Sequence, residues 1–174
     1  MEQELIEIAG DILEHPRFLE LKESRHHGKK NNLYDHCVRT ARCALRVCHG
    51  FDLSRHDTEM VVRAALLHDF FEYNWRDDSF YRFRHSGKGW QRLARMHAFY
   101  HGKRAASKAA ELFELNDRQL EAIERHMFPL AKMPMHKEGW IITLADKIAA
   151  VGDMAIPFGH RLTARCRASL GLEH

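Results

Sequence analysis

Four ionisable side chains occupy positions where helical spacing turns them toward apolar neighbours. His36, His68, His126 and Asp146 each lie three or four residues from apolar or small side chains, which is the spacing of one helix face. A carboxylate buried there without a partner is costly because it loses its hydration. The free-energy cost of burying such groups falls if several of them converge on a cation. Imidazole nitrogen and carboxylate oxygen together are ligands for Mn, Fe, Co, Ni or Zn.

The segments that carry these residues are predicted to be helices. The chain has no convincing period-2 segment and no internal repeat. Asn32 is expected to cap one helix, and the helix over 91–113 has a possible break near His101-Gly102. The expected helices cover about 1–14, 16–21, 33–51, 91–113 and 138–153, with one more from Ser54 or Asp57 to 73 and another from Asn116 or Asp117 to 127. Residues 74–89 form a lid-like loop or short turns. The fold class is therefore all-α.

Composition excludes several classes of protein. The 174 residues include 27 Lys+Arg, 24 Asp+Glu and 14 His, and 45% are hydrophobic, which is typical of a globular chain. A net charge of +3 without a known motif disfavours a nucleic-acid-binding module. No signal peptide or membrane-spanning run is apparent, so we expect a cytoplasmic protein with no membrane partner. Its four cysteines are expected to be reduced: Cys37, Cys43, Cys48 and Cys166.

The order of the candidate ligands resembles a known family. His36, then His68-Asp69, then Asp146 match the H…HD…D pattern of the HD superfamily of metal-dependent phosphohydrolases. The apolar run before His68-Asp69 and the helix around Asp146 are similar to that superfamily too. The resemblance implies an HD-type helical bundle, and the length of the chain predicts a single domain over residues 1–174. Its core would span about 33–153, with N-terminal helices 1–24 and a C-terminal tail packed on it.

The same resemblance implies one or two divalent ions. One ion would be held by His36, His68, Asp69 and Asp146. Members with two metals have further histidines between the HD pair and the last aspartate, and His101 and His126 lie in that interval. These two would hold a second ion, with Asp69 bridging. His97, one turn before His101, is an alternative ligand or a supporting residue.

The residues after the HD pair depart from the two-metal pattern. Many two-metal members continue with Gly-Lys, whereas this chain continues with Phe70-Phe71-Glu72. The HD-x-x-Glu arrangement is similar to the nucleotidase and guanosine-tetraphosphate hydrolase branches, in which that Glu assists water or proton transfer. Asp69 and Glu72 are therefore the catalytic candidates. Both the one-metal and the two-metal interpretations stay open.

Several basic and aromatic side chains are candidate substrate contacts. His97, Arg104 and Lys147 lie close in sequence to the expected ligands. Basic residues in 25–30 and 76–88 could attract an anion, although charged loops are usually solvated. Aromatic residues over 70–81 could stack on a base, but core packing explains Phe70 and Phe71 equally well.

The function that the resemblance implies is hydrolysis of a small phosphate ester by metal-activated water. A nucleotide is the favoured substrate, and monoester and diester both fit. The cofactor is one or two ions of Mn, Fe, Ni, Co or Zn, with Mg as a further option. Two alternatives remain: a non-catalytic regulator that binds metal or nucleotide, and a di-iron oxygenase. The sequence does not determine the oligomeric state.

Overall fold

The regular structure of the described residues is helical. The computed structural model describes residues 1–23, 32–71 and 97–169, with the side chains of 97–99 and 154–169 left out. Within these ranges there is no β-sheet, so the all-α prediction is confirmed. The elements are α1 (Glu2–Leu13), α2 (Pro16–Leu19), the 3-10 turn η1 (Glu20–Lys22), α3 (Leu33–Gly50), α4 (Arg55–Leu67), α7 (His97–Leu112), α8 (Asp117–Arg125) and α9 (Lys137–Ser169).

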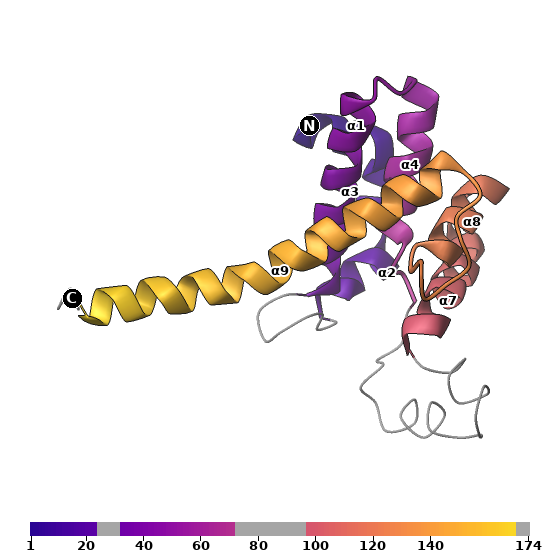
Figure 1. Ribbon diagram of the computed structural model, residues 1–174. Coiled ribbons are helices and arrows are strands. Elements are labelled where there is room, and N and C mark those ends of the chain that lie inside the picture. The colour runs from indigo at the N-terminus through magenta and orange to yellow at the C-terminus, as the bar shows by residue number, and fades with distance from the viewer. Residues whose placement is uncertain (24–31, 72–96, 170–174) are drawn as a thin grey trace, which may run out of the picture.

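Helix α9 joins the two parts of the helical body. It packs against α3 and α4 on one side and against α8 on the other, while α7 packs on α8 and α1 packs on α4. Figure 1 shows the first half of α9 crossing these helices and its C-terminal half extending away from them. Helices α3, α4 and α8 therefore meet along α9, and α7 joins them through its packing on α8 and α4. The single-domain organisation over residues 1–174 stays a prediction.

Polar side chains fix where three of these helices begin. The Asn32 side chain accepts a hydrogen bond from the Asp35 backbone N–H at 2.8 Å, which confirms the expected cap of α3. Ser54 Oγ accepts from the Asp57 N–H at 3.1 Å at the start of α4. Asn116 and Gln119 form a reciprocal capping box at the start of α8. These caps satisfy N–H groups that have no partner within the helix.

The inward face of α3 includes several small side chains. Its Cys37, Ala41, Ala44 and Cys48 are all 0% exposed. The facing part of α4 is equally apolar and includes small residues, among them Ala64 and Ala65. Small side chains let two helices approach closely. The Cys37, Cys43 and Cys48 thiols are free, as predicted.

Two helix boundaries differ from the sequence prediction. Helix α4 ends at Leu67 rather than near residue 73, so the HD pair lies in a turn instead of inside a helix. That turn is stabilised by the Phe70 N–H, which donates to the Leu67 carbonyl at 3.1 Å. Helix α9 continues from residue 153 to Ser169, since extending a formed helix needs no new nucleus.

Helix α7 is continuous where a break near His101-Gly102 was considered. The glycine serves the packing of α7 on α8 instead. A Cβ atom on Gly102 would lie 2.7 Å from the Glu124 carbonyl oxygen and 3.2 Å from that of Ile123. Only a residue without a side chain lets the two backbones come so close.

None of the described helices combines the length and the apolar character needed to cross a bilayer. The expected basic loop over 25–30 and the aromatic segment over 74–89 lie outside the described residues.

Candidate metal centre

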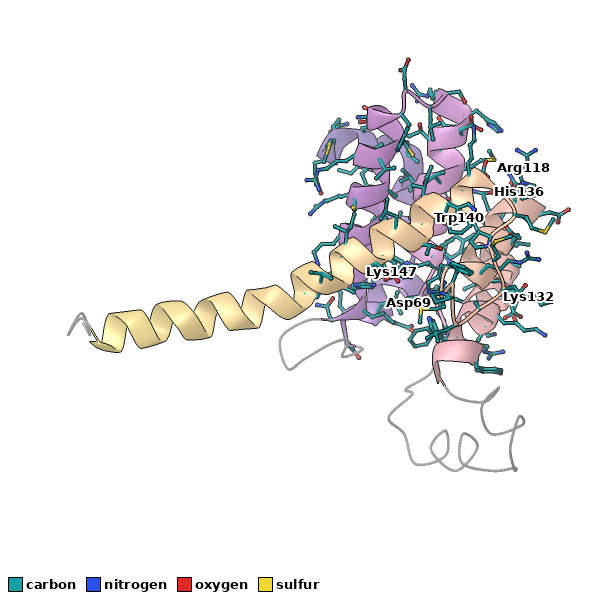
Figure 2. The ribbon with its side chains drawn as sticks, in the orientation of Figure 1. Asp69, Arg118, Lys132, His136, Trp140 and Lys147 are labelled. Carbon is teal, nitrogen blue, oxygen red and sulfur yellow. The ribbon has the colours of Figure 1, made fainter. Side chains whose placement is uncertain are left out.

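The structure brings the six predicted ligand residues together from five parts of the chain. His36 comes from α3, the His68-Asp69 pair from the turn after α4, His101 from α7, His126 from the end of α8 and Asp146 from α9. Figure 2 shows Asp69 beside α9, between the α3–α4 side and the α7–α8 side of the molecule. Among the described residues, two groups have ligand atoms within 4.8 Å of one another, and both contain Asp69: His36 with His68 and Asp69, and Asp69 with His101 and His126.

The two carboxylate oxygens of Asp69 divide between these groups. Oδ2 lies 3.9 Å from His36 Nε2 and 3.7 Å from His68 Nε2. Oδ1 lies 3.3 Å from His101 Nε2 and 3.7 Å from His126 Nε2. We call the Oδ2 side the first subsite and the Oδ1 side the second subsite. Among the described residues, Asp69 is the one that belongs to both groups.

Asp146 completes the first subsite from α9. Its Oδ1 lies 3.1 Å from His36 Nε2 and 3.6 Å from His68 Nε2. Ligands bonded to a transition metal at about 2.1 Å are separated from one another by roughly 3–3.4 Å. The spacings at the first subsite are therefore close to those of a coordination sphere. The ligand types are the nitrogen and oxygen donors that divalent transition metals accept.

Two of the histidines are oriented in the same way. His68 Nδ1 lies 2.8 Å from the Ala65 carbonyl oxygen, and His126 Nδ1 lies 2.7 Å from that of Ile123. A carbonyl can only accept, so each Nδ1 carries the proton and donates it. Each Nε2 is left facing the centre. This is the arrangement by which proteins orient metal-binding histidines.

Two buried atoms at the centre have no hydrogen-bond partner among the described residues. They are His68 Nε2 and Asp69 Oδ1. Buried polar atoms are nearly always partnered, and an ion is one explanation when they are not. Both atoms face other ligand atoms rather than apolar side chains. The residues present therefore fit a divalent cation.

His36 is held from both sides of its ring. Its Nε2 faces Asp146, and its Nδ1 lies 2.9 Å from Asp153 Oδ2. Asp153 is 0% exposed and also pairs with Arg39. The sequence predicts Asp153 only as the end of a helix. The available signal was its spacing of seven residues from Asp146, which is about two helical turns and places both on one face.

The charges of the first subsite compensate one another. Burial alone would lower the pKa of His36, but its bonds to Asp146 and Asp153 and the nearby Asp69 raise that pKa to about 9. Burial also opposes charge on His68, yet Asp69 and Asp146 raise its pKa. Burial would raise the pKa of both carboxyls, but the surrounding histidines hold them well below their usual range. The two carboxylates thus attract positive charge into a buried site.

At the second subsite the pKa of a histidine is lowered instead of raised. Burial, together with the neighbouring His68 and His101, lowers the pKa of His126 to about 3. His126 is therefore neutral at physiological pH, with a lone pair on Nε2. His101 Nε2 and His126 Nε2 lie only 3.1 Å apart. Two imidazole nitrogens that converge in this way suit a shared cation.

The other candidate residues are not brought into the cluster by any observed contact. Lys147 is exposed on α9, and Arg104 is half-buried on α7, three residues after His101. The His97 side chain and the whole of Glu72 lie outside the described residues. Their proposed roles remain predictions from the sequence.

Phe70 and Phe71 belong to the protein interior. Phe70 is 0% exposed, with its ring centroid 6.4 Å from that of Phe18 and 5.8 Å from that of Phe113. Phe71 is 3% exposed and packs against the His101 ring. Of the two roles considered for this pair, core packing is the one that these contacts support.

Comparison with known proteins agrees with this geometry. No curated protein and no solved structure matched the chain. A family model described as the HD domain matches residues 33–151, about two thirds of the chain, and this range includes all six converging residues. The chain therefore belongs to the HD domain family.

Proposed function

We propose that this HD domain protein is a metal-dependent phosphohydrolase that binds two divalent ions and acts on a small phosphate ester, with a nucleotide as the favoured substrate. The supporting observation is the division of the Asp69 oxygens between two groups of histidine nitrogens. Membership of the HD family supports the reaction class.

Each subsite has its own proposed ligands. His36, His68, Asp69 and Asp146 would hold one ion, and Asp69, His101 and His126 would hold the other. When bound, such ions bind phosphate oxygens and lower the pKa of water. Asp69 would fix the separation of the two ions because its carboxylate faces both subsites.

The charge of the cluster explains why ions would be needed. In the described part of the chain, the observed ion pairs of Asp69 and Asp146 are with histidines, and none is with Lys or Arg. A phosphate dianion next to two carboxylates would be repelled. Bound cations would reverse that sign and stabilise the negative charge that develops during hydrolysis.

The protein also controls access to the cluster. The His36, His68 and His126 side chains are at most 1% exposed, whereas that of Asp146 is 13% exposed. The Asp146 side of the first subsite is therefore its more open side, and we propose that substrate phosphate approaches there. Glu72 keeps the proton-transfer role proposed from its spacing to the HD pair.

The test is reconstitution of activity from metal-free protein. Protein stripped with a chelator would be loaded separately with Mn²⁺, Fe²⁺, Co²⁺, Ni²⁺, Zn²⁺ or Mg²⁺. Phosphate release would then be measured with p-nitrophenyl phosphate, bis(p-nitrophenyl) phosphate and a nucleotide panel. We expect hydrolysis that depends on the metal and is lost in Asp69→Asn but kept in Asp117→Asn, a change at an exposed aspartate.

Two results would contradict the proposal in different ways. Protein that retains no ion and hydrolyses no ester across the panel would exclude a metal-dependent phosphohydrolase. A nucleotide that raises the melting temperature without product release would indicate the non-catalytic regulator instead.

A further inference from the structure

Asp153 is a buried carboxylate on α9 that contacts the candidate centre through His36. Its Oδ2 lies 2.9 Å from His36 Nδ1, and the residue is 0% exposed. It is absent from the residues that the HD pattern singles out. A fully buried carboxylate needs a partner to offset its lost hydration, and His36 is one such partner.

One helix holds both nitrogens of the His36 ring. Asp146 Oδ1 lies 3.1 Å from Nε2, while Asp153 lies on the Nδ1 side. Two carboxylates seven residues apart on α9 are separated by about 10 Å along its axis, which leaves room for one imidazole between them. Rotation of the His36 ring would break both contacts, so the two carboxylates fix the orientation of the ring.

Arg39 holds the other oxygen of Asp153. Its Nη2 lies 2.5 Å from Asp153 Oδ1, and it follows His36 by three residues on α3. Residues three apart on a helix share a face. Arg39 therefore compensates the charge of Asp153 from α3, while the other carboxylate oxygen contacts His36.

The acceptor behind His36 differs from those behind two other histidines. His68 and His126 donate Nδ1–H to neutral backbone carbonyls. A carboxylate is a stronger acceptor than a carbonyl, and it increases the basicity of the opposite ring nitrogen. Because of this difference, His36 would donate electron density to a bound metal ion more strongly than His68 or His126 would.

We infer that Asp153 is a positioning residue, which holds His36 with Nδ1–H directed to α9 and Nε2 directed to the first subsite, and thereby strengthens metal binding there. This inference rests on the metal binding proposed above. It assigns Asp153 no contact with substrate.

The test measures Co²⁺ binding to metal-free protein by visible absorption, and it begins with the wild type as reference. The variants are then compared in a His126→Gln background, which removes a ligand of the second subsite. Asp153→Asn is expected to weaken Co²⁺ binding by about 10–100-fold, the usual effect of losing such a partner.

Arg39→Gln is the matched control. It removes the ion pair between Arg39 on α3 and Asp153 on α9 but leaves the Asp153 carboxylate in contact with His36. This variant is expected to bind Co²⁺ at least as tightly as the His126→Gln protein.

Each outcome bears on a different claim. Wild-type protein that binds no Co²⁺ would overturn the metal centre and this inference together. Wild-type binding with equal affinity in Asp153→Asn would overturn the inference alone. Equal weakening in Asp153→Asn and Arg39→Gln would assign Asp153 a purely structural role and would also overturn it.

A second measurement does not depend on the folding of a variant. Nitrogen-15 spectra of wild-type protein loaded with Zn²⁺ report which nitrogen of each histidine carries the proton. We expect His36 to carry its proton on Nδ1 and to bind the ion through Nε2. The reverse assignment would contradict the positioning role of Asp153.

Discussion

His68 and His126 meet edge to face, with ring centroids 4.9 Å apart and planes at 87°. Each follows the last residue of its helix, α4 for His68 and α8 for His126. Each also donates Nδ1–H to the carbonyl three residues before it. Helix C-termini carry partial negative charge, which favours a nearby cation. Two helices therefore end at the centre with the same ligand geometry and the same favourable dipole.

Replacing His126 should empty only the second subsite. His126→Gln removes one of its two imidazole donors, while the four ligands of the first subsite remain. We expect the variant to bind one ion per chain instead of two, measured by elemental analysis after gel filtration. Loss of both ions would show that the subsites are not separable.

Gly102 should be needed for the second subsite. In Gly102→Ala the new Cβ would lie 2.7 Å from the Glu124 carbonyl, so α7 must move away from α8. Overpacking of this kind costs about 1–3 kcal/mol, and the movement would separate His101 from His126. We expect a lower melting temperature and weaker binding of the second ion.

The control for that change is another helical glycine. Gly152 on α9 has open space where a Cβ would be placed. Gly152→Ala should keep or raise stability, since alanine is favoured over glycine in helices by roughly 0.5–1 kcal/mol. If the two alanine variants behave alike, close contact at Gly102 does not determine the position of α7.

The stability of the metal-free protein should have a maximum near pH 6.5. The pKa of His36 is raised to about 9, so between pH 6.5 and 9 the folded protein keeps a proton that the unfolded chain releases, and stability falls as pH rises. The pKa of His126 is lowered to about 3, so below pH 6.5 the unfolded chain gains a proton that the folded protein excludes, and stability falls as pH falls. Each proton contributes a slope of at most about 1.4 kcal/mol per pH unit.

Urea unfolding with chelator between pH 3 and 9.5 measures this profile. His36→Gln should flatten the alkaline side alone, and His126→Gln should flatten the acidic side alone, so each variant is the control for the other. A profile that is level between pH 6.5 and 9 would contradict the environment described for His36. Below pH 3.8, protonation of Asp69 and Asp146 should add to the acid loss, since their pKa values are lowered from that value by the histidines around them.

The cap of α8 should affect stability more than metal binding. Asn116→Ala removes the bond to the Gln119 N–H at 3.0 Å and should cost about 1 kcal/mol. His126 lies at the opposite end of α8, so both ions should still bind. Asn116→Asp keeps a capping oxygen and should retain nearly full stability in thermal unfolding. Loss of the second ion in Asn116→Ala would show that the start of α8 controls the subsite.

The sequence predicted the features that depend on local patterns. Apolar spacing and capping residues determine the helices: Asn32 caps α3 as expected, and Asn116, one of two candidate first residues, caps α8. The order of His36, His68-Asp69 and Asp146 resembles the HD pattern, and these residues converge.

Features that depend on contacts between distant elements were missed. The end of α4 at Leu67 depends on how the HD pair is held among the other ligands, which helical periodicity does not record. The contact of Asp153 with His36 joins residues 117 positions apart. The seven-residue spacing places Asp153 on the same helix face as Asp146, but it does not identify His36 as its partner.

Ion stoichiometry tests the central claim most directly. Metal-free wild-type protein, Asp69→Asn and Asp146→Asn would be titrated with Mn²⁺ by calorimetry, and bound metal would be counted by elemental analysis. If Asp69 serves both subsites, the wild type binds two ions, Asp146→Asn weakens only one of them, and Asp69→Asn weakens both by two orders of magnitude or more, since even a ligand's hydrogen-bond partner is worth about 10–100-fold. A wild-type protein that binds no ion, or an Asp69→Asn variant that still binds two ions with wild-type affinity, would contradict it.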